Sequence, residues 1–235
     1  MKGVKKKKGL KISGSIKKWR LGDYFRQLSA IIIGVVITFI GSDLINSHYK
    51  QKEVTSVMHL IKTELERNQE HIREVGEKII EEERIIKELV KYNFDYTKIP
   101  VDTLSAYKYF INVILPLEYG NTSLEVLRNS ALMQHVSDKE FLLKLTLAYD
   151  KIEKLARLVD EFYDRGEDAW KSVFAKAEIP KMISDDPAAY FNLVLENEDM
   201  RKYMVSVAGY FTRDSFQSVY DRAQECIQYI EKEYH

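Results

Sequence analysis

The chain has 235 residues, and its 36 Lys and Arg are balanced by 36 Asp and Glu, so the formal net charge is zero. A single cysteine, Cys226, excludes an intrachain disulfide and a metal site built from several thiolates. The charges are unevenly placed, because residues 1–27 carry +9 and the rest of the chain carries −9. No nucleic-acid partner is expected for the acidic main body, since phosphate contacts need clustered Lys and Arg.

An apolar stretch stands out at residues 28–45, where Asp43 is the only charged residue. Eighteen residues of α-helix rise about 27 Å, close to the bilayer hydrocarbon thickness of about 30 Å. We therefore expect a transmembrane helix at residues 21–46, behind a basic tail at residues 1–20. The tail is longer than the basic region of a cleavable signal, and no small-residue cleavage site follows, so a retained single-pass anchor in the lipid bilayer is predicted.

The charges that flank this stretch predict its orientation. Ten Lys and Arg precede it, whereas only Lys50 and Lys52 follow it closely. The positive-inside rule then places the N-terminus in the cytoplasm and the main body across the membrane, although the reverse orientation stays open. The basic tail is also able to contact anionic lipid, at about 1 kcal/mol per basic residue near the surface.

Small residues are spaced along one face of the apolar stretch. This face consists of Gln27, Ala30, Gly34, Thr38 and Gly41. Small residues four apart let helix backbones approach closely, so the face predicts packing between copies in a homo-oligomer. Two other interpretations stay open: the face lines a narrow pore, or it reflects only the abundance of Gly and Ala in membrane helices.

A long stalk helix is expected at residues 47–99, because no proline occurs before Pro100. Its apolar residues recur in a 4,3 rhythm, which is typical of a coiled coil or a bundle helix. These residues are Val54, Met58, Ile61, Leu65, Ile72, Val75, Ile79, Ile86 and Leu89. Further apolar positions widen the stripe, which favours packing against the chain's own helices. Asn68 interrupts the rhythm and is predicted to fix the register between copies.

Residues 100–235 are expected to complete a helical bundle. The predicted helices cover residues 103–115, 122–132, 138–177, 187–195 and 198–233, the last interrupted at Gly209. Ser137 with Glu140 is predicted to form a capping box, and Asp186 and Asn197 are predicted to cap later helices. No segment shows a strand pattern. The expected fold class is therefore all-α, with one N-terminal transmembrane helix that continues into a stalk helix packed in a helical bundle.

Two segments carry a family resemblance. The first is Tyr24–Asn46 together with the charged-helix sequence Thr63-Glu64-Leu65-Glu66-Arg67-Asn68. The second is Leu124-Glu125-Val126-Leu127-Arg128-Asn129-Ser130-Ala131-Leu132, which leads into Asp138-Lys139-Glu140-Phe141-Leu142 and then Tyr149. Over residues 24–165 the chain is similar to a widespread family of bacterial single-span proteins that is catalogued only as a domain of unknown function.

The chain departs from this family at three places. Gln27 stands where the family usually has a carboxylate, Ala131 where it has a glycine, and Ser42-Asp43-Leu44 where it has Asn-Asn-Trp. The resemblance implies an anchored helical protein in the bacterial inner membrane. It supplies no activity.

One motif suggests chemistry, since Arg128-Asn129 followed by His135 resembles the spacing in helical metal-independent RNases. In those enzymes His transfers protons and Arg stabilises phosphate. The competing interpretation is that these are ordinary surface or packing residues. His71 and Glu74 have the spacing of a metal-ligand pair on a helix, but no partner ligands are identifiable, so neither a metal nor a cofactor is expected.

The leading prediction is a non-enzymatic, homo-oligomeric, membrane-anchored protein that acts as a sensor or scaffold between the bundle and the membrane. One alternative is a membrane effector that forms an ion-conducting pore in a toxic or anti-phage defence response. A second alternative is a membrane-tethered helical RNase that uses Arg128 and His135.

Overall fold

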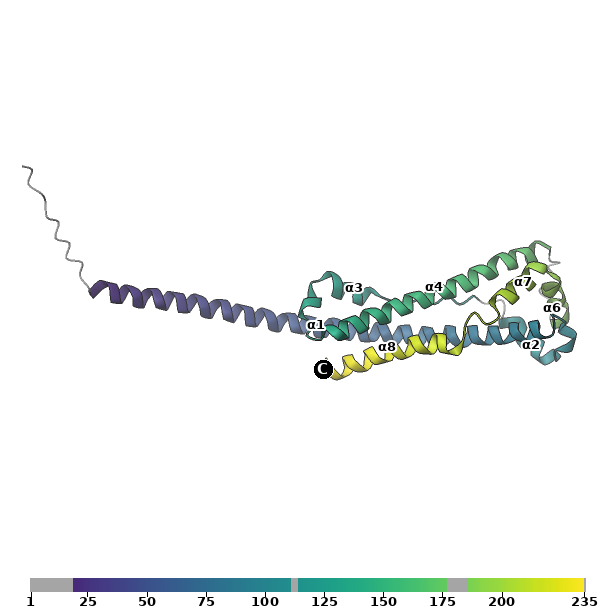
Figure 1. Cartoon of the computed structure of the whole chain (residues 1–235), viewed down its shortest axis with the longest axis horizontal. Coiled ribbons are helices and arrows are strands. Elements are labelled where there is room, and N and C mark those ends of the chain that lie inside the picture. The colour runs from purple at the N-terminus through teal and green to yellow at the C-terminus, as the bar shows by residue number, and fades with distance from the viewer. Residues whose placement is uncertain (1–18, 111–113, 177–185, 235) are drawn as a thin grey trace, which may run out of the picture. The chain divides into compact units, whose positions relative to one another are not determined.

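A computed structural model describes residues 19–110, 114–176 and 186–234 (Figure 1). All regular secondary structure in these ranges is helical, so the all-α prediction is confirmed. The helices are α1 (Trp19–Lys91), η1 (Tyr96–Lys98), α2 (Val101–Phe110), α3 (Thr122–Asn129), η2 (Leu132–His135), α4 (Lys139–Lys176), α6 (Pro187–Glu196), α7 (Glu198–Val207) and α8 (Arg213–Glu233). The chain divides into two compact units, residues 1–49 and residues 50–235, and α1 contributes to both.

The first unit contains the predicted membrane segment. Its described apolar side chains are all between 47 and 64 % exposed, namely Ile31, Ile32, Ile33, Val35, Val36 and Ile37. Within the part of the chain that was described, no helix is both long and apolar enough to cross a membrane. The expected span at 28–45 extends into residues 38–45, whose side chains lie outside that part.

The core of the second unit is built on α1 from Lys50 onward, with α4 and α8 packed alongside it (Figure 1). Every residue of the 4,3 rhythm is at most 2 % exposed, so the stripe is buried inside the chain. From α4, Leu145, Ile152 and Val159 enter the same core. Burial of such side chains stabilises the fold by about 1.5–3 kcal/mol each before entropy is subtracted. The helical-bundle prediction is thereby confirmed.

A second group of helices closes the end of the bundle at which α1 ends. There α6 packs against α2, η1 and α7 (Figure 1). Tyr190 and Phe191 of α6 are fully buried, and their rings meet edge to face at 5.4 Å between centroids. Phe162 of α4 contacts the ring of Phe211 at 5.7 Å. Because aromatic pairs fill large volumes with defined geometry, this end of the bundle is tightly specified.

Helix starts follow the predicted caps with one exception. Asp186 accepts a hydrogen bond from Ala188 N at the start of α6, and Asn197 accepts from Asp199 N and Met200 N at the start of α7. The prediction that Ser137 caps the long helix is wrong, because Asp138 Oδ1 accepts from Phe141 N at 2.8 Å. The other oxygen of Asp138 accepts from the Tyr229 hydroxyl of α8 at 2.6 Å, which favours Asp138 as the cap.

Two predicted helices end earlier than expected, and the interruption predicted at Gly209 is confirmed. α2 ends at Phe110, and the residues that follow, 111–113, lie outside the described ranges. α3 ends at Asn129, since Ala131 adopts a left-handed conformation with φ +56°. The last predicted helix separates into α7 and α8 at Gly209, where φ is +93°. A left-handed residue cannot continue a right-handed helix.

Candidate functional site

The first polar cluster of the second unit joins α1 to the segment that precedes α3. Asn68 on α1 is 1 % exposed, and its amide meets both backbone groups of Gly120. Asn68 Nδ2 donates to Gly120 O at 2.8 Å, and Gly120 N donates to Asn68 Oδ1 at 2.8 Å. A buried amide that satisfies two backbone groups fixes the position of a loop strongly, because leaving either group unpaired costs free energy.

Glu64, one turn before Asn68, extends this cluster to a third helix. Its Oε1 accepts a 2.6 Å hydrogen bond from the Tyr149 hydroxyl of α4, and its Oε2 accepts from Ser123 N at 3.0 Å. The carboxylate therefore caps α3 from another helix, since Asn121 makes no side-chain cap bond there. Burial first, and the bond to Glu64 second, hold the pKa of Tyr149 far above its ordinary value.

These contacts join the two segments that carry the predicted resemblance. Glu64 and Asn68 come from the first segment, and Tyr149 comes from the second. Beside them lies a groove of about 430 Å³, lined by side chains that include Leu60, Arg67 and His71. His71 Nδ1 lies 2.9 Å from Glu118 O, so this histidine also serves the loop.

A second polar cluster lies further toward the C-terminal end of α1. Its Glu82 and Glu83 are at most 2 % exposed. Lys78 Nζ contacts Glu82 Oε2 at 3.0 Å and the Tyr163 hydroxyl at 3.4 Å. Burial raises the pKa of Glu82 to about 7, against the opposing effect of Lys78. Burial and the charge of Glu82 also raise the pKa of Tyr203.

Glu83 points to a different partner from its neighbour. Its carboxylate accepts from Gly209 N at 3.0 Å and from Phe211 N, and it pairs with Lys87 at 2.9 Å. One buried acid thus holds the turn between α7 and α8 against α1. An acidic run such as residues 81–83 suggests a solvated helix face, but tertiary packing covers Glu82 and Glu83.

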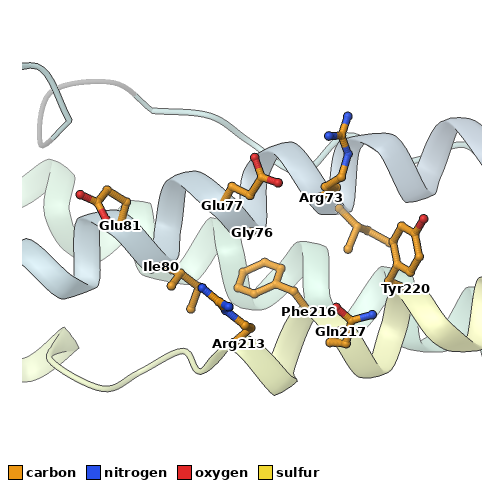
Figure 2. Close-up of a pocket in the computed structure, with 10 residues that line it drawn as sticks. Arg73, Gly76, Glu77, Ile80, Glu81, Arg213, Phe216, Gln217 and Tyr220 are labelled. Atoms are coloured by element: carbon orange, nitrogen blue, oxygen red, sulfur yellow. The ribbon is translucent and has the colours of Figure 1, made fainter.

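A third feature is a groove of about 460 Å³ between α1 and α8, which we call the α1–α8 groove (Figure 2). Its floor contains Phe216 and Gly76, and the Phe216 ring lies so close that a Cβ on Gly76 would stand 2.9 Å from Phe216 Cγ. Its charged rim has Glu77 on the α1 wall and Arg213 on the α8 wall. Sequence patterns give no signal for this groove, because the two helices are far apart along the chain.

The RNase-like residues lie on two short helices, α3 and η2, which a turn at Ser130 and Ala131 separates. Arg128 on α3 forms an exposed ion pair with Glu125 at 2.9 Å. His135 ends η2, and its Nε2 contacts only the Gln134 amide, at 3.4 Å, among the described hydrogen bonds. No contact between Arg128 and His135 is observed in the described ranges.

The predicted packing face of the membrane segment is described only in part. Ala30 is exposed, and a Cβ added to Gly34 would meet nothing within 4 Å. The side chains of Gln27, Thr38 and Gly41 lie outside the described part of the chain. Asn68 has its partners inside the chain, and its predicted role in the register between copies stays a prediction.

Metal or thiol chemistry receives no support from the side chains that the structure describes. Among them, no group of three or more His, Cys, Asp or Glu is arranged to hold a metal ion. Burial raises the pKa of the Cys226 thiol to about 11. Such a thiol is largely protonated at neutral pH and therefore a poor nucleophile.

The described residues define an all-α protein in which a helical bundle is built on one long helix. No protein-family model, no curated protein and no solved structure matches this chain. The resemblance over residues 24–165 therefore stays a prediction.

Proposed function

We propose that this chain is a non-enzymatic membrane protein, anchored by residues 28–45, whose helical bundle serves as a sensor or scaffold in a homo-oligomer. The observation that carries the proposal is the exposure of residues 31–37 in the first unit. Six β-branched apolar side chains project from all sides of that part of α1, and no other described part of the chain packs against them. A helix that is apolar on all sides needs lipid or protein around it.

The second unit supports a binding rather than a catalytic role. Its buried Asn68 and Glu83 and its half-buried Glu64 hold backbone groups within the bundle. Such groups are occupied by the fold itself and are not free to act on a substrate. The helix α1 contributes to the membrane segment and to the bundle core, so binding at the bundle is covalently connected to the anchor.

Membrane extraction tests the anchor. We expect the full-length chain to stay in the membrane fraction after carbonate washing. The double variant Ile33→Lys and Ile37→Lys should move to the aqueous fraction, because each charge costs about 2.5–3.5 kcal/mol at the centre of a membrane helix. Leu143→Lys with Leu147→Lys, at exposed positions of α4, is the matched control and should remain with the membrane. An aqueous wild-type chain would disprove the proposal.

A further inference from the structure

We propose that the α1–α8 groove is the surface through which two copies of this chain pair, with a two-fold axis that runs along the groove. This inference rests on the proposed function, because it names the partner of the bundle in the homo-oligomer. The groove lies wholly within the second unit, and its lining comes from two helices that run in opposite directions (Figure 2).

The helix directions follow from three contacts between α1 and α8. Going up α1, Lys62 pairs with Glu231, Gln69 bonds to Tyr220 O, and Gly76 lies under Phe216. The residue number rises along α1 while it falls along α8, so the helices are antiparallel. A two-fold axis between them then sets α1 of each copy beside α8 of the other copy, at the same height. The result is a four-helix arrangement in which both α1 helices point the same way.

Charge complementarity identifies the second copy as the occupant. Glu77 and Arg213 are exposed, and neither forms an ion pair or side-chain hydrogen bond within the described chain. Figure 2 places Arg213 beside Ile80, at the end of the groove where Glu77 and Glu81 project from the other wall. Under the two-fold axis, Arg213 of one copy lies about one helical turn from the height of Glu77 of the other copy, within reach of its long side chain, and the same pair forms twice. Because an isologous interface repeats each contact, opposite charges on its two walls attract at both places.

The apolar floor supports the pairing but does not account for it alone. Phe216 is 6 % exposed and Ile72 is 1 % exposed, so little apolar area remains to be covered. Tyr220 and Ile80 are half-buried and border the floor. A pair of this kind is weak between free domains, and anchoring in one membrane raises the effective concentration of the copies. The anchor and the groove therefore act together.

The experiment uses full-length chains with two different affinity tags, which are co-expressed, crosslinked while they are in the membrane and then purified in detergent, because the shared membrane supplies the effective concentration that a weak pair needs. The readout is copurification of the second tag with the first. Arg213→Glu in both copies, or Glu77→Arg in both copies, sets two pairs of like charges against each other. Each variant alone should reduce copurification about tenfold, equivalent to about 1.4 kcal/mol.

The decisive arm mixes the two variants. When one tagged copy carries Arg213→Glu and the other carries Glu77→Arg, both cross-copy pairs become complementary again. Copurification should then return to within about twofold of wild type, because attraction restores the free energy that like charges removed. Attraction between Glu77 and Arg213 of the same chain would not be rescued in this way, since each chain keeps its own repulsion.

Arg201→Glu, an exposed substitution on α7 away from the groove, is the control and should leave copurification unchanged. Arg213→Gln guards against misfolding, because it removes the charge without reversing it and should lower copurification less than Arg213→Glu. Unchanged copurification in the single variants, or no rescue in the mixture, would overturn the groove as the interface. Either result leaves carbonate extraction unaffected, so the two proposals fail separately.

Discussion

At the scale of single residues, Ala131 shows where local geometry and residue type disagree. Its φ of +56° lies in the left-handed region, between the end of α3 and the start of η2. An L-residue with a Cβ pays about 1–2 kcal/mol in this conformation, whereas glycine adopts it freely. The resemblance predicted from the sequence implies a glycine at this position, and glycine is the residue that adopts the left-handed conformation without strain.

We expect Ala131→Gly to raise the free energy of unfolding by about 1 kcal/mol, because the relief of strain exceeds the added entropy of the unfolded chain. Thermal unfolding of the detergent-solubilised protein, followed by circular dichroism, measures this change. Ala156→Gly, in the middle of α4, is the control and should be destabilising by about 1 kcal/mol or more, because glycine in a helix interior is added to the loss of a buried methyl group. Equal effects at both positions would contradict the left-handed assignment.

Glu82 is the residue whose burial has a consequence for pH dependence. Its carboxyl pKa is raised from 4.5 to about 7, first by burial, and Lys78 opposes this shift. Tyr163 and Tyr203 are the other titratable groups around it, from α4 and α7, and Glu83 is its neighbour on α1. A carboxyl with a raised folded-state pKa contributes stability below pH 4.5, and that stability is lost as pH rises through 7.

We expect Glu82→Gln to become progressively more stable than wild type between pH 5 and pH 8, with a difference of about 3 kcal/mol at the upper end. The reason is that the neutral amide never acquires the charge that the core disfavours. Unfolding at several pH values measures the difference, with Glu140→Gln at an exposed site as control. A difference that stays constant from pH 5 to pH 8 would show that Glu82 does not titrate there.

At the scale of elements, the contact between α1 and α8 depends on Gly76, because glycine has no side chain. Gly76 lies in the middle of α1, where glycine costs about 1 kcal/mol relative to alanine. A Cβ at this position would stand 2.9 Å from Phe216 Cγ, closer than side-chain atoms pack. The helix thus gives up intrinsic propensity so that the ring of Phe216 can pack against its backbone.

We expect Gly76→Ala to lower the free energy of unfolding by about 1 kcal/mol, because overpacking costs about 1–3 kcal/mol and helix propensity returns about 1. In the Phe216→Ala background, the ring is gone, and Gly76→Ala should become stabilising. Thermal unfolding of the four proteins completes the double-mutant cycle. An additive result would show that the ring and the glycine do not meet.

At the scale of the whole molecule, the ten Lys and Arg that precede the apolar stretch, against Lys50 and Lys52 close behind it, predict which side of the membrane carries the bundle. A membrane-impermeant maleimide tests this in spheroplasts of cells that express a Cys226→Ser background. We expect Glu198→Cys, exposed on α7, to be labelled without permeabilisation, because the basic flank stays in the cytoplasm. Lys2→Cys should be labelled only after permeabilisation. The opposite labelling pattern would establish the reverse orientation.

The sequence by itself determined the all-α class, the long helix and most helix starts. These follow from short-range rules: the 4,3 rhythm of α1 reports a buried stripe, and Asp186 and Asn197 are side chains that cap the residues next to them. Helix propensity and capping depend on residues within one or two helical turns, so the amino-acid sequence alone predicts them.

Only the tertiary structure decided what the polar residues of α1 do. Glu83 resembles its half-buried neighbour Glu81 in sequence, yet it holds the turn at Gly209, 126 residues further along the chain. Asn68 has the pattern of a register residue between copies, and the fold places it on Gly120. The partners of such groups are set by how helices far apart in the sequence pack together. A pattern of neighbouring residues does not identify such a partner. The α1–α8 groove has the same origin, since its two walls meet only after the bundle has closed.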